Sequence, residues 1–392
     1  MDAPTPDPAA APDAPSPAPA PASRLIGLDV ARAVAILGMI VVHFCLVAAA
    51  DQTTPPWMAA ILRALDGRAS AVFILLAGIG VTLMTRGAVH RQDIARRNEL
   101  QVVLIRRGIA LLVLGLLNLT IWSGDILRIY GVSLIVVSCL FDRSSRALLI
   151  WAAAFALAFI GLFAAFDFSQ NWDWETMTYQ RLWTPSGQLR NLFYDGFRSV
   201  FPWTGLLIFG MWLGRLDLTR QDICRRLLLL GAATAAAAEG LSWSLLRWLA
   251  PTAGQSRSDV PELAAPSLPA DEARALFGTD SMPALPLFLL AAGGTAVSVI
   301  ALGCLATNRW PGRGWKPLVA TGQMALTWYM AHILLGLGGL VAFNQVGAHS
   351  LPAAAALGVA FFAIAVLVST LWNRIARRGP LEIALRRLSE PE

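Results

Sequence analysis

Charged residues, lysines and cysteines are all scarce in this sequence. Charged residues make up 14% of the 392 positions and hydrophobic residues 56%, whereas a soluble domain has about 25% charged residues. This composition excludes an ordinary soluble protein, because hydrocarbon penalises ionised side chains and a membrane protein therefore confines them to its loops. The four cysteines are scattered and form no CxxC pair, so we expect neither a disulfide framework nor a metal site.

The basic residues are almost all arginines, and Lys316 is the single lysine. A net charge of +6 would also suit a nucleic-acid-binding protein. In this chain, however, the arginines lie in short clusters between apolar runs, which is the arrangement found in the cytoplasmic loops of membrane proteins. We therefore expect the lipid bilayer, and no nucleic acid, as a partner.

Ten apolar runs alternate with polar loops, and a transmembrane helix needs about 20 residues. The predicted spans are 29–49, 69–86, 103–122, 126–141, 147–166, 198–214, 228–249, 285–305, 318–342 and 353–372, of which the fourth is the shortest. The sequence thus predicts an all-α polytopic bundle of about ten transmembrane helices. We expect it in the cell membrane, as a multi-pass protein of a bacterial inner or plasma membrane.

The loops predict the orientation of the bundle. Most of the 31 basic residues lie before the first span, in the loops after the second, fourth, sixth and eighth spans, and after the tenth. The positive-inside rule places these segments, and so both termini, in the cytoplasm. The opposite loops include a Trp-rich stretch near 171–190 and a Pro/Ser-rich one at 251–283. Both are long enough to carry a substrate-facing surface or to be flexible.

The ends of the chain differ from its middle. Residues 1–23 are almost only Ala, Pro and Asp, which cannot bury a core, so we predict a disordered cytoplasmic tail. Residues 24–376 form the predicted transmembrane domain. Residues 377–392 contain PLEIALRRL, which predicts a short amphipathic helix on the cytoplasmic membrane surface.

The first predicted span carries three ionisable residues at membrane depth, where each is costly unless paired. Asp29 and Arg32 are three residues apart on one helix face and can form an ion pair. His43 follows Arg32 by eleven residues, about three turns and roughly 16 Å further along the same face. The pair is either structural or functional. His43 is either a helix-packing residue or, as we favour, a functional one.

The pattern LD-xx-R, then an apolar run and His43, resembles the opening span of the acyltransferase-three family of membrane O-acyltransferases. The heparan-alpha-glucosaminide N-acetyltransferase group opens similarly, although it tends to carry Asn in place of His43. Four further segments resemble the YeiB-like family, known as domain of unknown function 418. They are GRASAVFILLAGIG (67–80), DILRIYGVSLIV (125–136), GQMALTWYMAHILLG (322–336) and RGPLEIALRRL (378–388).

This resemblance implies transfer of an acyl, acetyl-like group from acyl-coenzyme A at the cytoplasmic face to an acceptor outside. It places Arg32, with Asp29 beside it, near the point where the donor enters, and gives His43 the transfer step. The chemistry agrees with these residue types, since an imidazole with a pKa of about 6.5 can act as a general base. An arginine can bind phosphate through two parallel hydrogen bonds.

Other candidates lie at the ends or in the middle of later spans. Arg68 and Ser70 begin the second span beside the outer face, near the expected position of His43, and are candidates for the donor site. Glu239 lies in the middle of the seventh span, where a carboxylate must be protonated or paired. It is either a catalytic proton relay or a helix–helix contact.

Two pairs are candidates for the substrate site. Asp125 and Arg128 open the fourth span three residues apart, an arrangement more common in interfacial anchors. Tyr329 and His332 share one face of the ninth span, where hydrogen bonding across helices is the more common role. Gly210 and Gly214 have GxxxG spacing, which predicts close helix packing.

A membrane acyltransferase is the leading hypothesis, with acyl-coenzyme A as donor substrate and the hydroxyl or amine of an envelope glycan or lipid as acceptor. A transporter or permease of a small molecule is the alternative. The absence of an inverted repeat and of helices broken by Gly or Pro weakens it. A structural or regulatory membrane protein is the third alternative. A homodimer stays open, as do the acyl chain and the acceptor.

Overall fold

The computed structural model describes residues 25–50, 56–249 and 268–390. The described residues are mostly helical, with one short two-stranded hairpin, which confirms the predicted all-α membrane bundle. The tail predicted at 1–23 lies outside the described residues, as does the part of the 251–283 loop up to residue 267.

In chain order, the helices and strands are α1 (Ile26–Ala48), α2 (Pro56–Leu65), α3 (Arg68–His90), α4 (Ile94–Leu119), α5 (Leu127–Val137), α6 (Ser145–Ala165), β1 (Trp172–Asp173), β2 (Thr178–Tyr179), α7 (Pro185–Arg190), the π-helix η1 (Asn191–Asp195), α8 (Val200–Leu213), α9 (Gln221–Leu249), α10 (Ala270–Phe277), α11 (Pro286–Arg309), the 3-10 helix η3 (Arg313–Trp315), α12 (Lys316–Gly322), α13 (Ala325–Ala331), the π-helix η4 (His332–Leu337), α14 (Gly338–Ala342), α15 (Leu351–Trp372) and α16 (Pro380–Ser389).

Eight helical segments of the described chain are long and apolar enough to cross a membrane, and they coincide with eight of the ten predicted spans. The fourth and sixth predicted spans instead form α5 and α8, which have only 11 and 14 helical residues. At about 1.5 Å per residue, both are shorter than a hydrocarbon core of about 30 Å. In α8 the backbone is not helical at Phe201, directly before Pro202, because the residue before proline is disfavoured in the helical region.

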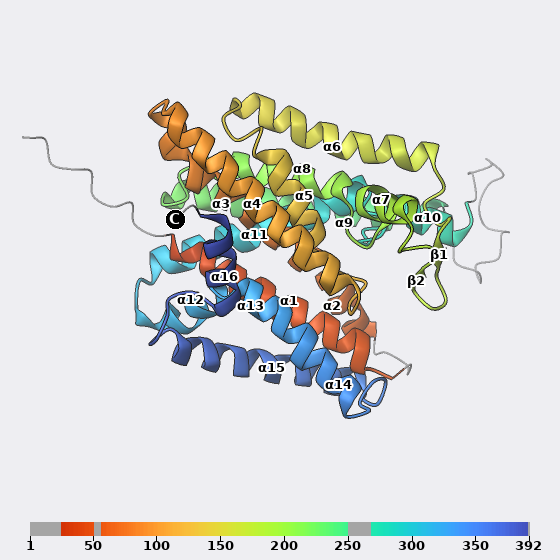
Figure 1. Cartoon of the computed structure of the whole chain (residues 1–392). Helices are drawn as coiled ribbons and strands as arrows, with labels where there is room; N and C mark the ends of the chain where they lie inside the picture. Colours follow the sequence, from red (N-terminus) through yellow and green to blue (C-terminus); the bar gives the residue numbers. More distant parts are fainter. Residues whose placement is uncertain (1–24, 51–55, 250–267, 391–392) are drawn as a thin grey trace, which may run out of the picture.

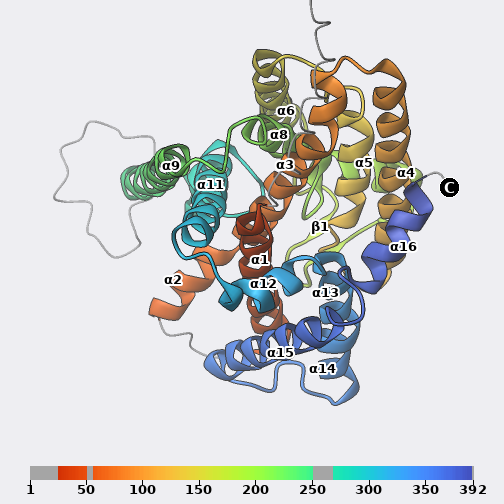
Figure 2. The ribbon, with the colours of Figure 1, turned by 90° about the vertical axis from the view of Figure 1, so that its left-hand side faces the viewer.

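The helix α1 lies in the middle of the bundle. It packs against α15, α11, α12 and α3, and Figure 2 shows it with α9 and α11 on one side and α4 and α5 on the other. In Figure 1 the start of α1 and the helix α16 lie at one end of the bundle, whereas the hairpin and α10 lie at the opposite end. The polar residues of α1 therefore lie inside the protein.

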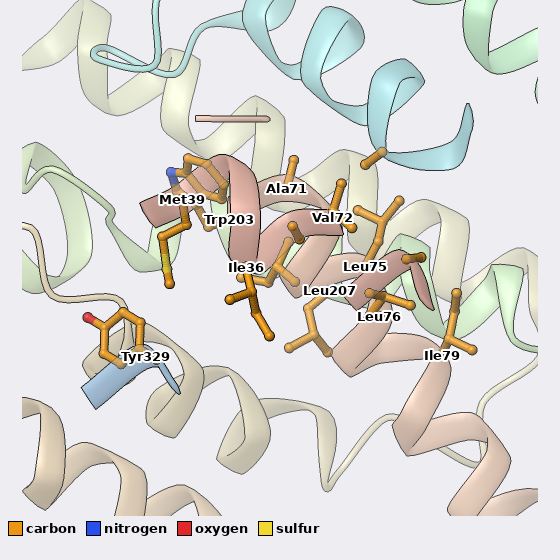
Figure 3. Close-up of a cluster of buried hydrophobic side chains, with 14 of the residues drawn as sticks. Ile36, Met39, Ala71, Val72, Leu75, Leu76, Ile79, Trp203, Leu207 and Tyr329 are labelled. Atoms are coloured by element: carbon orange, nitrogen blue, oxygen red, sulfur yellow. The ribbon is translucent and has the colours of Figure 1, made fainter. Parts of the chain in front are cut away.

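Packing between α1, α3 and α8 forms the core beside this central helix. Figure 3 shows the buried side chains, which are Ile36 and Met39 of α1, Ala71, Val72, Leu75, Leu76 and Ile79 of α3, and Trp203 and Leu207 of α8. A Cβ added at Gly210 would overlap the carbonyl oxygen of Leu75, and one at Gly214 would lie 2.9 Å from Thr82 Cβ. The predicted close packing at the GxxxG pair is therefore confirmed.

The ninth predicted span, 318–342, is not one continuous helix. The helix α12 ends at Gly322 and α13 begins at Ala325. Glu382 of α16 accepts hydrogen bonds at this break from the backbone N–H groups of Leu326 and Thr327, at 2.7 and 3.1 Å. The first N–H groups of a helix have no partner within it, and a carboxylate from a distant part of the sequence supplies one at this position. The spanning part of this segment is therefore Ala325–Ala342, and the separate helix α12 precedes it.

Candidate functional site

Three cavities follow one another through the bundle along α1. We call them the arginine cavity, about 280 Å³, the middle cavity, about 230 Å³, and the outer cavity, about 730 Å³. The first two share Arg32 and Leu385, and the last two share His43, Ser70 and Arg198 among their lining residues. Arg32 thus lies at one end of the middle cavity and His43 at the other.

The arginine cavity lies at the end of the bundle where α1 begins. Its lining includes four arginines and two carboxylates, namely Arg32, Arg107, Arg378, Arg386, Asp29 and Glu382. The predicted pair of α1 forms, with Arg32 NH1 2.7 Å from Asp29 Oδ1. Gln323, in the break between α12 and α13, donates a further hydrogen bond to Asp29 Oδ2 at 3.3 Å. These contacts hold Arg32 at the junction with the middle cavity.

The middle cavity is mostly apolar. Side chains from α1, α3, α4, α5 and α13 line it, among them Met39, Phe73, Leu111, Leu127 and Leu326. Met39 and Tyr329, both labelled in Figure 3, lie where the buried core borders this cavity. The middle cavity therefore offers an apolar passage between a cationic end and an imidazole.

His43 contacts a second histidine from a distant part of the sequence. Its Nδ1 lies 2.8 Å from Nε2 of His332, which is fully buried at the first position of the π-helix η4. The indole ring of Trp122 also lies against His43, with ring centroids 4.9 Å apart. Such π-helical turns are frequent at functional sites. The structure thus brings together two residues that the sequence placed separately, in the first and ninth spans.

The hydrogen bonds of this pair indicate the protonation of each ring nitrogen. His332 Nδ1 lies 3.2 Å from the backbone carbonyl oxygen of Trp328, and a carbonyl can only accept. His332 therefore donates from Nδ1, and its Nε2 is left to accept from Nδ1 of His43. With Nδ1 of His43 protonated, its Nε2 carries a lone pair. That nitrogen is available to a molecule in the cavities that His43 lines.

Arg198 lies next to His43, and sequence reasoning missed it as a site residue. It lines both the middle and outer cavities and donates to Ser70 Oγ at 3.4 Å and to Ser281 Oγ at 3.3 Å. Its guanidinium carbon lies 5.0 Å from the ring centroid of Trp203. In the sequence it stands at the very start of an apolar run, where an arginine usually indicates an anchor at the end of a transmembrane helix.

Loops that carry aromatic side chains complete the outer cavity, which α1 and α3 also line. The Trp-rich loop predicted on this face forms the hairpin β1–β2, and Trp174, Met177 and Tyr179 line the cavity. Trp122 lines it as well, and its Nε1 is buried without a hydrogen-bond partner among the described residues. Asp280, after α10, lines the outer cavity too, and burial raises the pKa of its carboxyl group.

A buried carboxylate holds the hairpin in place. Asp195 accepts hydrogen bonds from Tyr179 Oη at 2.7 Å and from Arg190 Nε at 2.5 Å, and its side chain is fully buried. Burial raises the pKa of Asp195, and the bonds from Tyr179 and Arg190 act in the opposite direction. Burial also raises the pKa of the neighbouring Tyr194 to about 12. This clamp makes the hairpin an ordered wall of the outer cavity.

The predicted pair Asp125–Arg128 lies in a buried network next to the histidines. Asp125 Oδ1 accepts from Asn118 Nδ2 at 2.8 Å and from the Tyr329 hydroxyl at 3.3 Å. Arg128 donates to Asn191 Oδ1 at 3.0 Å, which links α5 to η1. Asp125 and Arg128 are 1% and 2% exposed, and neither lines the three cavities. The network therefore contacts the cavity lining through the hydrogen bond between Asp125 and Tyr329.

Two other candidates pair with each other away from His43. Arg68 NH2 lies 2.5 Å from Glu239 Oε1, and Thr279 donates to Glu239 Oε2 at 2.8 Å. Neither Arg68 nor Glu239 lines the three cavities. This is the helix–helix contact that the sequence left open for Glu239, between α3 and α9. Of Arg68, Ser70 and Glu239, only Ser70 lines the middle and outer cavities together with His43.

Within the described residues, no three His, Cys, Asp or Glu side chains come together as a metal site. The sequence model of a protein family, described as the catalytic part of heparan-alpha-glucosaminide N-acetyltransferase, matches residues 24–250, which is more than half of the chain. A second model, described as a protein of unknown function (DUF418), matches residues 270–391. No curated protein matches the chain. His43 lies in the first matched segment and His332 in the second.

Proposed function

This multi-pass membrane protein belongs to the heparan-alpha-glucosaminide N-acetyltransferase family and carries its acetyltransferase-like catalytic domain, and we propose that it transfers an acetyl-like acyl group from acyl-coenzyme A to a hydroxyl or amine. The observation that carries this proposal is the position of His43, where the middle and outer cavities meet. A donor from one side and an acceptor from the other would reach the same imidazole.

The donor enters through the arginine cavity. Arg32 is held by Asp29 at its junction with the middle cavity, and a guanidinium can bind phosphate with two parallel hydrogen bonds. The eleven residues from Arg32 to His43 span about 16 Å along α1, comparable with the extended pantetheine arm. The apolar middle cavity takes this arm and leads the thioester to His43.

The transfer is a single displacement at the thioester carbonyl. His43 Nε2 takes the proton of the acceptor hydroxyl or amine as its oxygen or nitrogen bonds to the carbonyl carbon. The tetrahedral centre then collapses, the carbon–sulfur bond breaks, and the coenzyme A thiolate leaves with the proton from His43. His332 is a positioning residue in this step, because its hydrogen bond sets which nitrogen of His43 is protonated.

The negative charge that develops on the carbonyl oxygen needs hydrogen-bond donors. Arg198 and Trp122 Nε1 are two such groups around His43. Arg198 lines both cavities, and the indole N–H of Trp122 is buried without a partner in the described chain. An unpaired buried donor is costly, and a carbonyl oxygen in the site would give it an acceptor.

The acceptor binds in the outer cavity, which we place on the extracytoplasmic side of the cell membrane. Its aromatic wall, Trp122, Trp174 and Tyr179, and the carboxyl group of Asp280 suit a polar molecule with flat apolar faces. An envelope glycan or lipid headgroup has this chemistry. The arginine-rich loops then face the cytoplasm, where acyl-coenzyme A is made.

The test is acyl transfer by His43→Ala in membranes supplied with labelled acyl-coenzyme A. Removing a general base is expected to lower transfer about 10²- to 10⁴-fold. His90→Ala is the matched control, because His90 is exposed at the end of α3 and lines none of the three cavities. His332→Ala is expected to lower the rate less and to change its pH profile. Undiminished transfer by His43→Ala would reject His43 as the base.

One observation favours the transporter alternative. The ninth segment is broken between α12 and α13 and contains a π-helix, and interrupted helices are common at the binding sites of transporters. The two functions separate in sealed vesicles that contain the purified protein. No acyl transfer by the parent protein, together with saturable uptake of a labelled solute, would favour the transporter.

A further inference from the structure

The C-terminal helix α16 forms part of the wall of the proposed donor site. It packs against α4 and α13, and its Leu385 lines both the arginine and middle cavities. Arg386 of this helix and Arg378, just before it, line the arginine cavity with Arg32 and Arg107. Two of the four arginines thus come from the last segment of the described chain.

The carboxylates of the arginine cavity are already engaged in other contacts. Asp29 pairs with Arg32. Glu382 caps α13, accepting from the backbone of Leu326 and Thr327 and, at 2.6 Å, from the Thr327 hydroxyl. With four arginines against these two carboxylates, the lining has a surplus of positive charge.

One further carboxylate bridges two of these arginines. Glu390 Oε1 lies 3.2 Å from Arg107 NH2, and its Oε2 lies 2.5 Å from Arg386 Nε. The Glu390 side chain is 37% exposed, so water and ligands can reach it. A phosphate group carries more negative charge than a carboxylate and has three acceptor oxygens, so it can displace Glu390 from the two guanidinium groups. The guanidinium of Arg378, which lines the same cavity, offers a third cation.

We propose that Arg107, Arg378 and Arg386 form a phosphate-binding site for the nucleotide end of coenzyme A, in which Glu390 occupies the phosphate position until the donor binds. This inference rests on the proposed function for the identity of the donor. It assigns a role to the end of the segment that matches the family of unknown function. Because Glu382 of the same helix caps α13, phosphate bound to α16 also stabilises the segment that carries Tyr329 and His332.

The experiment measures binding of coenzyme A, and of pantetheine as a probe without phosphate, to the full chain in phosphatidylcholine nanodiscs. Arg378→Gln/Arg386→Gln is expected to weaken coenzyme A binding at least about tenfold, because hydrogen bonds to charged groups are lost. Pantetheine binding should change less than about twofold. Glu390→Gln should tighten coenzyme A binding by about two- to fivefold, since a competing exposed ion pair is removed.

Arg387→Gln is the matched control on the same helix. Arg387 is exposed and lies outside the arginine cavity, so its loss removes one positive charge from α16 without removing a ligand. A thermal unfolding midpoint within about 2 °C of the parent for each variant shows that the bundle is intact. Equal coenzyme A affinity in Arg387→Gln and Arg378→Gln/Arg386→Gln would overturn the proposal.

A lipid headgroup has the same phosphate chemistry, and nanodiscs with added phosphatidylglycerol separate the two sources. If the double variant keeps its coenzyme A affinity but loses bound phosphatidylglycerol in native mass spectrometry, the site binds lipid and the proposal is wrong. Acyl transfer is measured in parallel. If the double variant binds coenzyme A as tightly as the parent and still transfers the acyl group, this site is rejected and the proposed function stands. If the double variant binds coenzyme A more weakly but the parent transfers no acyl group, the proposed function is rejected and the site stands.

Discussion

The arginine cavity and the outer cavity, at the two ends of the row of three cavities, are lined by different structural elements. At the arginine end, charged side chains come from the long helices α1 and α4 and from the segment at α16, and ion pairs such as Asp29–Arg32 hold them. At the outer end, residues of α1 and α3 form one part of the wall, and a hairpin and loops that carry Trp122, Trp174 and Tyr179 form the rest. Helices give fixed positions, whereas loops vary more easily between related proteins. This contrast agrees with the proposed function, in which one anionic donor binds at the arginine end and an acceptor binds at the outer end.

After His43→Ala, the largest effect is expected for Arg198, which lies where the two ends meet. Arg198→Gln should lower kcat about 10²- to 10³-fold, as loss of an oxyanion donor does, with smaller changes in KM for either substrate. Steady-state kinetics with both substrates varied gives these values. Because Arg198 lines both the middle and the outer cavity, we expect the loss of kcat not to be explained by weaker binding of either substrate alone.

Arg181→Gln is the control for Arg198, because Arg181 is an exposed arginine of the same outer region and lines none of the cavities. Arg198→Lys keeps the charge and should recover part of the rate. A rise in the KM of one substrate with an unchanged kcat would assign Arg198 to binding at that end instead.

The next effect concerns the arginine end. Arg32→Gln should raise KM for acyl-coenzyme A about 10- to 100-fold, because a hydrogen bond between charged groups is lost, and should leave KM for the acceptor unchanged. Arg91→Gln, an exposed arginine at the end of α3 and outside the cavities, controls for net charge. If acceptor KM rises equally, the proposed division of labour between the two ends is wrong.

The smallest effect concerns the outer end. Trp174→Ala should raise KM for the acceptor about two- to tenfold, the expected loss of one aromatic contact, with donor KM unchanged. Trp183→Ala is the matched control, since Trp183 is 62% exposed in the same loop region and lies outside the outer cavity. Equal effects of the two variants would show that the hairpin contributes general stability and not acceptor binding.

Local spacing was enough to predict the first helix. The Asp29–Arg32 pair and the common face with His43 follow from helix periodicity alone, and both Arg32 and His43 line the middle cavity. The alternation of apolar runs and arginine-rich loops likewise predicted the bundle. Such properties depend on a few neighbouring residues, which a single sequence displays directly.

Contacts between distant segments could not be predicted in this way. His43 and His332 are 289 residues apart, and nothing in either span indicates the other. The Arg68–Glu239 pair joins two residues that were interpreted separately as donor-binding and catalytic. Arg198 was not recognised as a site residue, and the break before α13 has its partner, Glu382, in a different helix. These features arise from three-dimensional packing.

The cap on α13 has a consequence for how the protein is made. Glu382 follows every apolar segment in the sequence, so during synthesis the N–H groups of Leu326 and Thr327 enter the membrane before their acceptor exists. Segments nearer the N-terminus of a chain fold first as it emerges. We therefore expect α13 and the following π-helix with His332 to become ordered only when α16 docks. A nascent chain that stalled after α15 would lack the carboxylate that caps α13.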